Sequence, residues 1–306
     1  MQPDDFLPLS HDEQMSLALP QIGEKTQADR SSYRDIIIGS ALLLLLVGFA
    51  FLVPLFSPYT YEGCCLVDKN LSPCSVHIFG TDDLGRDLAT RVAFGLRISL
   101  SIAIVAALLD LFIGLSWGSI SGYIGGLTDL FMMRIADFIY SIPYLLSVIL
   151  VAAIIGPGIS SILVAMCFIG WIQMARLSRT QVLGVKEQDY ITAARAVGVS
   201  NFGIITRHIL PNISGPILAM LMLTVPNAIF AESFLSFLGI GIQPPLASLG
   251  SMISDGLPAL RFYPWRLFIP AVFVTFTILA FNLVGDGLRD LLDPKQQKLV
   301  QGSYAS

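Results

Sequence analysis

The stretch that decides the fold is residues 36–56, which reads IIIGSALLLLLVGFAFLVPLF. Its 21 residues carry no charged side chain. A helix of about 20 apolar residues is long enough to cross the ~30 Å hydrocarbon core of a bilayer. The stretch is too long for the core of a secretory signal peptide, and no small-residue cleavage site follows it. It therefore predicts a retained membrane-spanning helix.

Five more apolar stretches follow along the chain. They cover residues 98–122, 138–156, 159–175, 213–239 and 267–285. With the first stretch they predict an all-α, polytopic membrane protein with six spans and both ends on one side. Placing the N-terminus inside assigns 12 of the 18 basic residues to cytoplasmic segments and 6 to the outside. Because Lys and Arg are enriched in cytoplasmic loops, we expect both termini to be cytoplasmic.

The composition agrees with a membrane protein and excludes other classes. Of the 306 residues, 54% are hydrophobic and 13% are charged, with a mean hydropathy of +0.73. Soluble domains carry roughly 25% charged residues. The net charge of −4 gives no basic surplus that would favour nucleic acid as a partner. The lipid bilayer is the expected surroundings.

These patterns predict the organisation of the whole chain. The first 35 residues carry seven acidic and three basic side chains, which is typical of a solvated tail. A short docking element around residues 15–19 is the alternative. The expected segments are a cytoplasmic polar tail at 1–35, a first span at 36–56, an extracytoplasmic loop at 57–94, a transmembrane domain of five helices at 95–290 with a long cytoplasmic loop at about 186–212, and a cytoplasmic tail at 291–306.

Three of the four cysteines lie in the predicted outside loop. Cys64, Cys65 and Cys74 face the oxidising side in this topology, where thiols tend to pair. A disulfide from Cys74 to Cys64 or Cys65 is therefore expected. A metal site is less favoured, because no Cys-x-x-Cys spacing is present and His77 is the only nearby imidazole.

Two acidic residues fall inside predicted spans. Asp110 lies near the middle of the second span, and Glu232 lies close to the outer end of the fifth. Acids at such depths normally face the interior of the bundle or water. They are candidates for a translocation pathway or gate, and the alternative is a protonated or hydrogen-bonded acid that holds two helices together.

The loop between the fourth and fifth spans has a helix–turn–helix pattern. Its small and apolar residues recur at i, i+3, i+4 and i+7, which places them on one helix face: Tyr190, Ala193, Ala194 and Val197. Gly198 stands where a helix end favours positive φ. Ser200 or Asn201 can cap a second helix to about residue 209, and Pro211 opens the next span.

This loop resembles the coupling loop of ABC importer permeases. That motif is Glu-Ala-Ala, three residues, Gly, nine residues and Ile-x-Leu-Pro. Here it reads Thr192-Ala193-Ala194, then Gly198, then Leu210-Pro211 at the same spacing. Thr192 replaces the usual Glu, and His208 replaces the usual Ile.

Three other segments resemble the C-type subunit of peptide permeases, so the resemblance covers about residues 33–297. They are FGTDDLGRD at 79–87, ESFLSFLG at 232–239, and GDGLRD at 285–290 with Leu292-Asp293-Pro294. The resemblance implies the type I ABC importer permease fold, the bacterial plasma membrane and a peptide cargo. Oligopeptides are favoured over the dipeptides or nickel carried by other members.

The resemblance also implies partners. These are a sister permease, two cytoplasmic ATPase subunits that bind ATP and Mg, and an extracytoplasmic peptide-binding protein. None of the five lysines follows a glycine, so the chain lacks a Walker-type phosphate loop and is expected to bind no cofactor itself. We expect a transport subunit, not an enzyme. All three histidines lie outside the spans, which disfavours a proton-coupled secondary transporter. The spans also lack the polar residues of an intramembrane enzyme.

Overall fold

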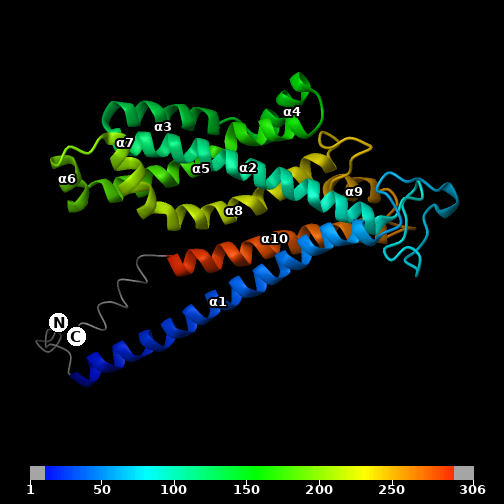
Figure 1. The fold of residues 1–306 in the computed structure, drawn as a ribbon, viewed down its shortest axis with the longest axis horizontal. Coiled ribbons are helices and arrows are strands. Elements are labelled where there is room, and N and C mark those ends of the chain that lie inside the picture. Colours follow the sequence, from blue (N-terminus) through cyan, green and yellow to red (C-terminus); the bar gives the residue numbers. More distant parts are fainter. Residues whose placement is uncertain (1–10, 293–306) are drawn as a thin grey trace, which may run out of the picture.

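The protein is a bundle of long helices that run roughly along one common direction (Figure 1). The computed structural model describes residues 11–292, with side chains from residue 32 onward. This part of the chain contains helices and no strands. In order, the elements are α1 His11–Phe56, η2 Leu66–Asp68, α2 Leu88–Ile124, α3 Gly126–Tyr140, α4 Tyr144–Ile155, α5 Ile159–Lys186, α6 Asp189–Ala196, α7 Asn201–Ile204, the π-helical η3 Ile205–Ile209, α8 Leu210–Phe237, α9 Leu249–Gly256 and α10 Trp265–Leu292.

Five described helices are long and apolar enough to cross a membrane, and a bent pair makes six if it counts as one span. The five are Ser32–Phe56, Leu88–Ile124, Ile159–Lys186, Asn201–Phe237 and Trp265–Leu292. In an apolar 18-residue stretch of the first helix, 17% of the residues are buried within the chain. In the corresponding stretch of the third helix, 50% are buried. The remaining apolar side chains therefore face lipid or another subunit.

The expected third span, residues 138–156, is interrupted by a break between two helices. α3 ends at Tyr140, α4 begins at Tyr144, and their axes differ by 80°. Pro143 lies at this break as the residue before α4. Proline has no N–H to donate and disfavours a helical conformation in the residue before it, so the helix stops here.

Several expected boundaries also need correction. α2 begins at Leu88, so the first two turns of this helix lie within the predicted loop 57–94. Asp87 caps it: its carboxylate accepts from the Thr90 backbone N–H at 2.8 Å. α1 begins at His11, so residues 11–35 of the predicted tail are helical. Residues 1–10 and 293–306 lie outside the described part, including most of the predicted C-terminal tail.

α2 and α5 pack along most of their length through a row of glycines on α2. A β-carbon at Gly114 would press on the backbone of Trp171, one at Gly118 on Ala175, and one at Gly122 on Arg179. Glycines four residues apart share one helix face and let two backbones approach closely, as in membrane helix pairs. This pair forms the centre of the bundle.

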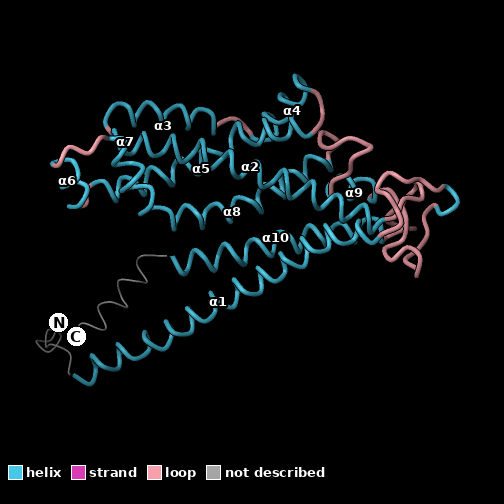
Figure 2. Tube along the Cα trace, in the orientation of Figure 1, coloured by secondary structure: helices cyan, strands magenta, loops and turns pink. Residues whose placement is uncertain are grey.

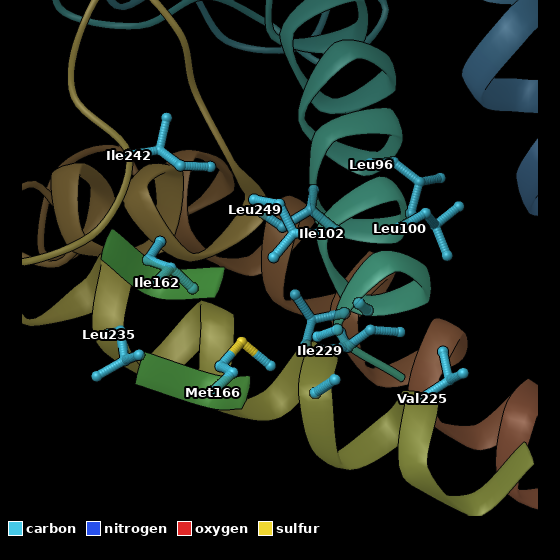
Figure 3. Close-up of a cluster of buried hydrophobic side chains, with 14 of the residues drawn as sticks. Leu96, Leu100, Ile102, Ile162, Met166, Val225, Ile229, Leu235, Ile242 and Leu249 are labelled. Carbon is cyan, nitrogen blue, oxygen red and sulfur yellow. The ribbon is translucent and has the colours of Figure 1, made fainter. Parts of the chain in front are cut away.

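The main core lies where α2, α5, α8 and α9 meet. Figure 3 shows Ile102 of α2 beside Leu249 of α9, with Ile229 of α8 and Met166 of α5 close by. Ile229 and Leu249 are fully buried. The core fixes α9 against the spans at one end of the bundle.

That end also carries the long loop before α2, held by buried ion pairs. Asp82 accepts from Arg86 Nε at 2.7 Å and pairs with Arg91 of α2. Burial alone raises the pKa of Asp82, but Arg91 and Arg86 outweigh it and bring the pKa below its usual value. Arg266 of α10 contacts Asp83 at 3.1 Å. These contacts give a structural role to the FGTDDLGRD segment.

The opposite end of the bundle carries α6 and α7. Figure 1 shows these two short helices far from α9 and from the loop before α2. In Figure 2 the largest group of loops lies at the α9 end. The last residues of α10 run toward the end that carries α6 and α7 (Figure 1). The two ends are therefore distinct surfaces, separated by the length of the spans.

Candidate functional site

The loop at residues 186–212 forms the helix–turn–helix that its sequence predicts. α6 ends in a Schellman motif: Val199 N donates to Ala194 O at 3.1 Å, and Gly198 N donates to Arg195 O at 3.0 Å. Gly198 has a φ of +86°, which a residue with a β-carbon rarely adopts. Ser200 then caps α7, because its Oγ accepts from Gly203 N at 3.2 Å.

The sequence predicts that the second loop helix ends at about residue 209, before the next span. The structure instead continues this helix into the span. α7, η3 and α8 form one continuous helix from Asn201 to Phe237. Pro211 has no N–H for the helical ladder, and the π-turn η3 immediately before α8 accommodates the rearranged hydrogen bonds. Movement of the loop is thus linked to movement of α8.

Buried isoleucines hold the loop on the bundle. Ile191 of α6, Ile204 of α7 and Ile209 of η3 are each fully buried. They pack with Met174 and Val182 of α5 in a separate apolar cluster. Ile191 was not predicted, because the i, i+3, i+4, i+7 pattern of this helix marks the face of Tyr190 and Ala193 instead.

The face predicted from the i, i+3, i+4, i+7 pattern points largely away from the bundle. Tyr190 is 43% exposed and Val197 is 85% exposed, and Thr192 and Ala193 are also exposed, whereas Ala194 is half-buried. Phe202 of α7 adds a 78% exposed ring that was not predicted. Tyr190, Val197 and Phe202 are called the α6–α7 surface below. Of the other motif residues, Leu210 is half-buried against the same cluster and Pro211 is exposed.

A second region of interest is a cavity of about 370 Å³ between the spans, lined in part by Asp110. Asp110 is only 6% exposed. Its Oδ1 has no hydrogen-bond partner among the described residues. The other polar lining side chains are Tyr140, Tyr144, Gln173, Thr224 and Asn227.

Glu232 lies elsewhere and does not line this cavity. It is fully buried, and its carboxylate accepts from Ser99 of α2 and from Ser236 of α8, each at 2.8 Å. Ser99 Oγ also accepts from Leu249 N of α9 at 3.4 Å. Glu232 therefore connects three helices, which matches the alternative role as a hydrogen-bonded acid. The two intramembrane acids are not brought together.

The three cysteines of the loop before α2 are exposed free thiols in the structure. Cys74 Sγ accepts from His77 N at 3.4 Å, and Cys64 Sγ donates to Glu62 O at 3.3 Å. The predicted link from Cys74 to Cys64 or Cys65 is not formed here and stays a prediction. His77 contacts Asp87 at 3.0 Å instead of joining a metal site. Among the side chains that the structure describes, residues 32–292, no group of three His, Cys, Asp or Glu is arranged to hold a metal ion.

An all-helical chain with five or six apolar spans and a cavity between them has the architecture of a polytopic membrane permease. Comparison with known proteins identifies the family. A profile described as "Binding-protein-dependent transport system inner membrane component" matches residues 112–298. The chain belongs to this family.

Individual relatives agree with the profile. The "Oligopeptide transport system permease protein OppC" of Bacillus subtilis (strain 168) is 51% identical over 261 residues, which cover 85% of this chain and 86% of the relative. The "Dipeptide transport system permease protein DppC" of the same strain is 45% identical over 302 residues, or 97% and 94% of the two chains. The OppC protein of Escherichia coli (strain K12) is 43% identical over 263 residues, or 85% and 87%.

Proposed function

We propose that this chain is the membrane-spanning permease subunit of an ATP-driven importer of peptides. The names of its relatives support peptides as the cargo over nickel or other solutes. Oligopeptides are favoured over dipeptides, since the identity to the OppC relative of Bacillus subtilis is 51% and that to the DppC relative is 45%. ATP and Mg bind to partner subunits, and this chain supplies half of the translocation pathway.

The α6–α7 surface is the single observation that best supports coupling to an ATPase. Its three apolar side chains are exposed in α6, in the turn after it and in α7, at one end of the bundle. Large exposed apolar side chains at the end of a bundle are suited to contact another protein. The loop is nevertheless well anchored, because Ile191 beneath it is fully buried. A rigid helix that presents apolar groups is suited to receive force from a docked subunit.

The continuous helix gives this force a route into the membrane. α7 and η3 lead directly into α8, and α8 contributes Thr224 and Asn227 to the wall of the Asp110 cavity. A displacement of α6 and α7 therefore changes the position of one cavity wall. ATP drives the change only if it binds one conformation of the complex more tightly than the other.

The remaining partners follow from the surfaces left uncovered. In each of the five spans, at most half of the residues in the apolar stretch are buried within the chain. The remaining apolar surface is available for a sister permease. The sister presents a matching loop, so that each permease docks one ATPase subunit. The α9 end faces the external binding protein that delivers the peptide.

The orientation that goes with this function is N-terminus and C-terminus inside, with α6 in the cytoplasm and the α9 end outside. Single cysteines at Glu187 and at Gln243, both exposed positions, test it in a version whose four native cysteines are replaced by serine. A membrane-impermeant maleimide should label Gln243→Cys on spheroplasts and Glu187→Cys only after the membrane is opened. Labelling of both positions from the same side would contradict the orientation.

Reconstitution tests the function itself. Proteoliposomes that hold this chain, its sister and both ATPase subunits should accumulate labelled trialanine when the binding protein and hydrolysable ATP are supplied. Omitting ATP or the binding protein should remove uptake. Uptake by this chain alone along a proton or sodium gradient would instead identify a secondary transporter.

A further inference from the structure

The cavity between the spans carries one charged side chain. Four spanning segments contribute to it: Asp110 from α2, Tyr144 from α4, Gln173 from α5 and Thr224 from α8, with Tyr140 at the end of α3. No Lys, Arg or His is among the described residues that line it. Its electrostatic character is therefore set by the carboxylate of Asp110.

That carboxylate has no counter-charge within the described chain. Asp110 Oδ1 is buried without a partner, and no ion pair of the described residues involves this acid. Arg176 does not line the cavity but contacts one of its lining residues, because its guanidinium lies 4.6 Å from the centroid of the Tyr140 ring. Arg176 is already paired with Asp137 at 2.8 Å. A buried carboxylate is unfavourable until a cation or a proton compensates it.

Space is reserved for the carboxylate at this point. Gly170 of α5 faces Asp110, and a β-carbon at position 170 would collide with the carboxylate oxygens. Any other residue would displace the acid from its position. The absence of a side chain at Gly170 thus allows α2 and α5 to pack closely while Asp110 still borders the cavity.

The other lining groups complement an organic cation that carries an amide. The ring of Tyr144 offers an aromatic group to an ammonium, whereas the ring of Tyr140 already lies under the guanidinium of Arg176. The amides of Gln173 and Asn227 each offer both donor and acceptor atoms to a peptide group. The lining has no cationic partner for a carboxylate, so it does not suit the carboxyl end of a peptide.

We propose that the Asp110 cavity binds the ammonium group at the amino terminus of the peptide during its passage. The inference rests on the proposed function, since it assumes that peptides pass along this chain. The cavity volume of about 370 Å³ is near the lower end of the roughly 300–1,000 Å³ typical of small-molecule sites. It accommodates one end of a peptide, and the rest of the peptide lies in the pathway shared with the sister subunit.

Charge-selective thiol labelling tests the cavity directly and does not depend on transport. In the complete complex, with the four native cysteines replaced by serine, Thr224→Cys places a thiol in the cavity wall. The probes are the cationic trimethylammonium-ethyl and the anionic sulfonatoethyl methanethiosulfonates, applied with and without ATP. Asp110→Asn, combined with Thr224→Cys, keeps the size and removes the charge. A version that retains only the exposed Cys74 is the control.

The measured quantity is the labelling rate of Thr224→Cys with the cationic reagent divided by its rate with the anionic reagent. We expect this ratio to be about tenfold larger with Asp110 than with Asp110→Asn, because charges interact strongly at low dielectric. At Cys74 the preference should be the same in both backgrounds. An equal preference at Thr224→Cys in both backgrounds would overturn the proposal. So would a failure of every reagent to label Thr224→Cys, because the cavity would then be closed to ions.

A competition experiment identifies the ammonium group as the ligand. Trialanine should slow labelling of Thr224→Cys, whereas N-acetyltrialanine, which lacks the ammonium group, should not. Asp110→Asn should remove the protection. Equal protection by the two peptides, or none by either, would contradict the assignment. If the wild-type complex failed to import trialanine although labelling was charge-selective, the proposed function would be wrong and the cation site would remain.

Discussion

Val197→Asp should reduce ATP-driven peptide uptake to below about a tenth of the wild-type rate while the chain stays at normal abundance in the membrane. Val197 is 85% exposed, so the substitution removes little packing within the chain. Exposed substitutions usually change stability by about 0.5 kcal/mol or less. Docking of an ATPase on this surface, as we propose, buries the same side chain, and burial of a Val side chain contributes about 1.5–3 kcal/mol. An unpaired carboxylate at that contact adds a further desolvation cost.

Gly198→Val should give the same loss through a different physical route. Gly198 has a φ of +86°, and a β-branched residue there costs about 1–3 kcal/mol in backbone strain. The Schellman turn is then lost and α7 is displaced relative to α6. The matched control for Val197→Asp is Val67→Asp, because Val67 is 91% exposed and lies at the other end of the bundle. Uptake rate divided by membrane abundance is the measurement. Normal uptake by both Val197→Asp and Gly198→Val would exclude this loop as the coupling element.

Gly118→Leu should prevent stable folding. A β-carbon at Gly118 would lie 2.8 Å from Ser178 Cβ and 2.9 Å from the backbone N of Arg179. Most of the atoms it meets belong to the α5 backbone and cannot rotate away. Overpacking typically costs about 1–3 kcal/mol, and the separation of two close helices raises it further. We expect low membrane abundance and a lower unfolding temperature in detergent.

The control for this effect is the same substitution where the structure leaves room. Gly48 lies in α1, and the nearest atom to a β-carbon there is Leu52 Cδ1 at 4.0 Å. Gly48→Leu should therefore leave abundance and unfolding temperature near the wild-type values. Equal loss in both variants would mean that glycine itself, rather than the α2–α5 contact, is what the spans require.

The spans and the loop motif were predictable because their signals are local. A run such as residues 36–56 has no folded alternative that avoids the bilayer, and Gly198 follows a helical pattern at the position where positive φ is needed. Features that depend on contacts between distant segments were not predictable for the same reason. Pro143 within an apolar stretch is compatible with either a kink or a break, and hydropathy does not distinguish them. The row of glycines in α2 is visible in the sequence, but the sequence does not show that α5 is the helix that packs against it.

The two intramembrane acids show where sequence reasoning ends. Asp110 and Glu232 give similar signals, namely one acid inside an apolar stretch. The partners that separate their roles are distant in sequence: Ser99 lies 133 residues from Glu232. Gly170, which leaves space for Asp110, lies on another helix. Only tertiary packing reveals that Glu232 is satisfied and that Asp110 is not.

Co-purification measures whether the ATPase docks on the α6–α7 surface. The amount of ATPase subunit recovered per copy of affinity-tagged chain is measured for the wild type, Val197→Asp, Gly198→Val and Val67→Asp, each extracted from membranes in mild detergent. The account predicts near wild-type recovery for Val67→Asp and at least a tenfold decrease for the two loop variants. Wild-type recovery of ATPase with both loop variants would show that the subunits dock elsewhere.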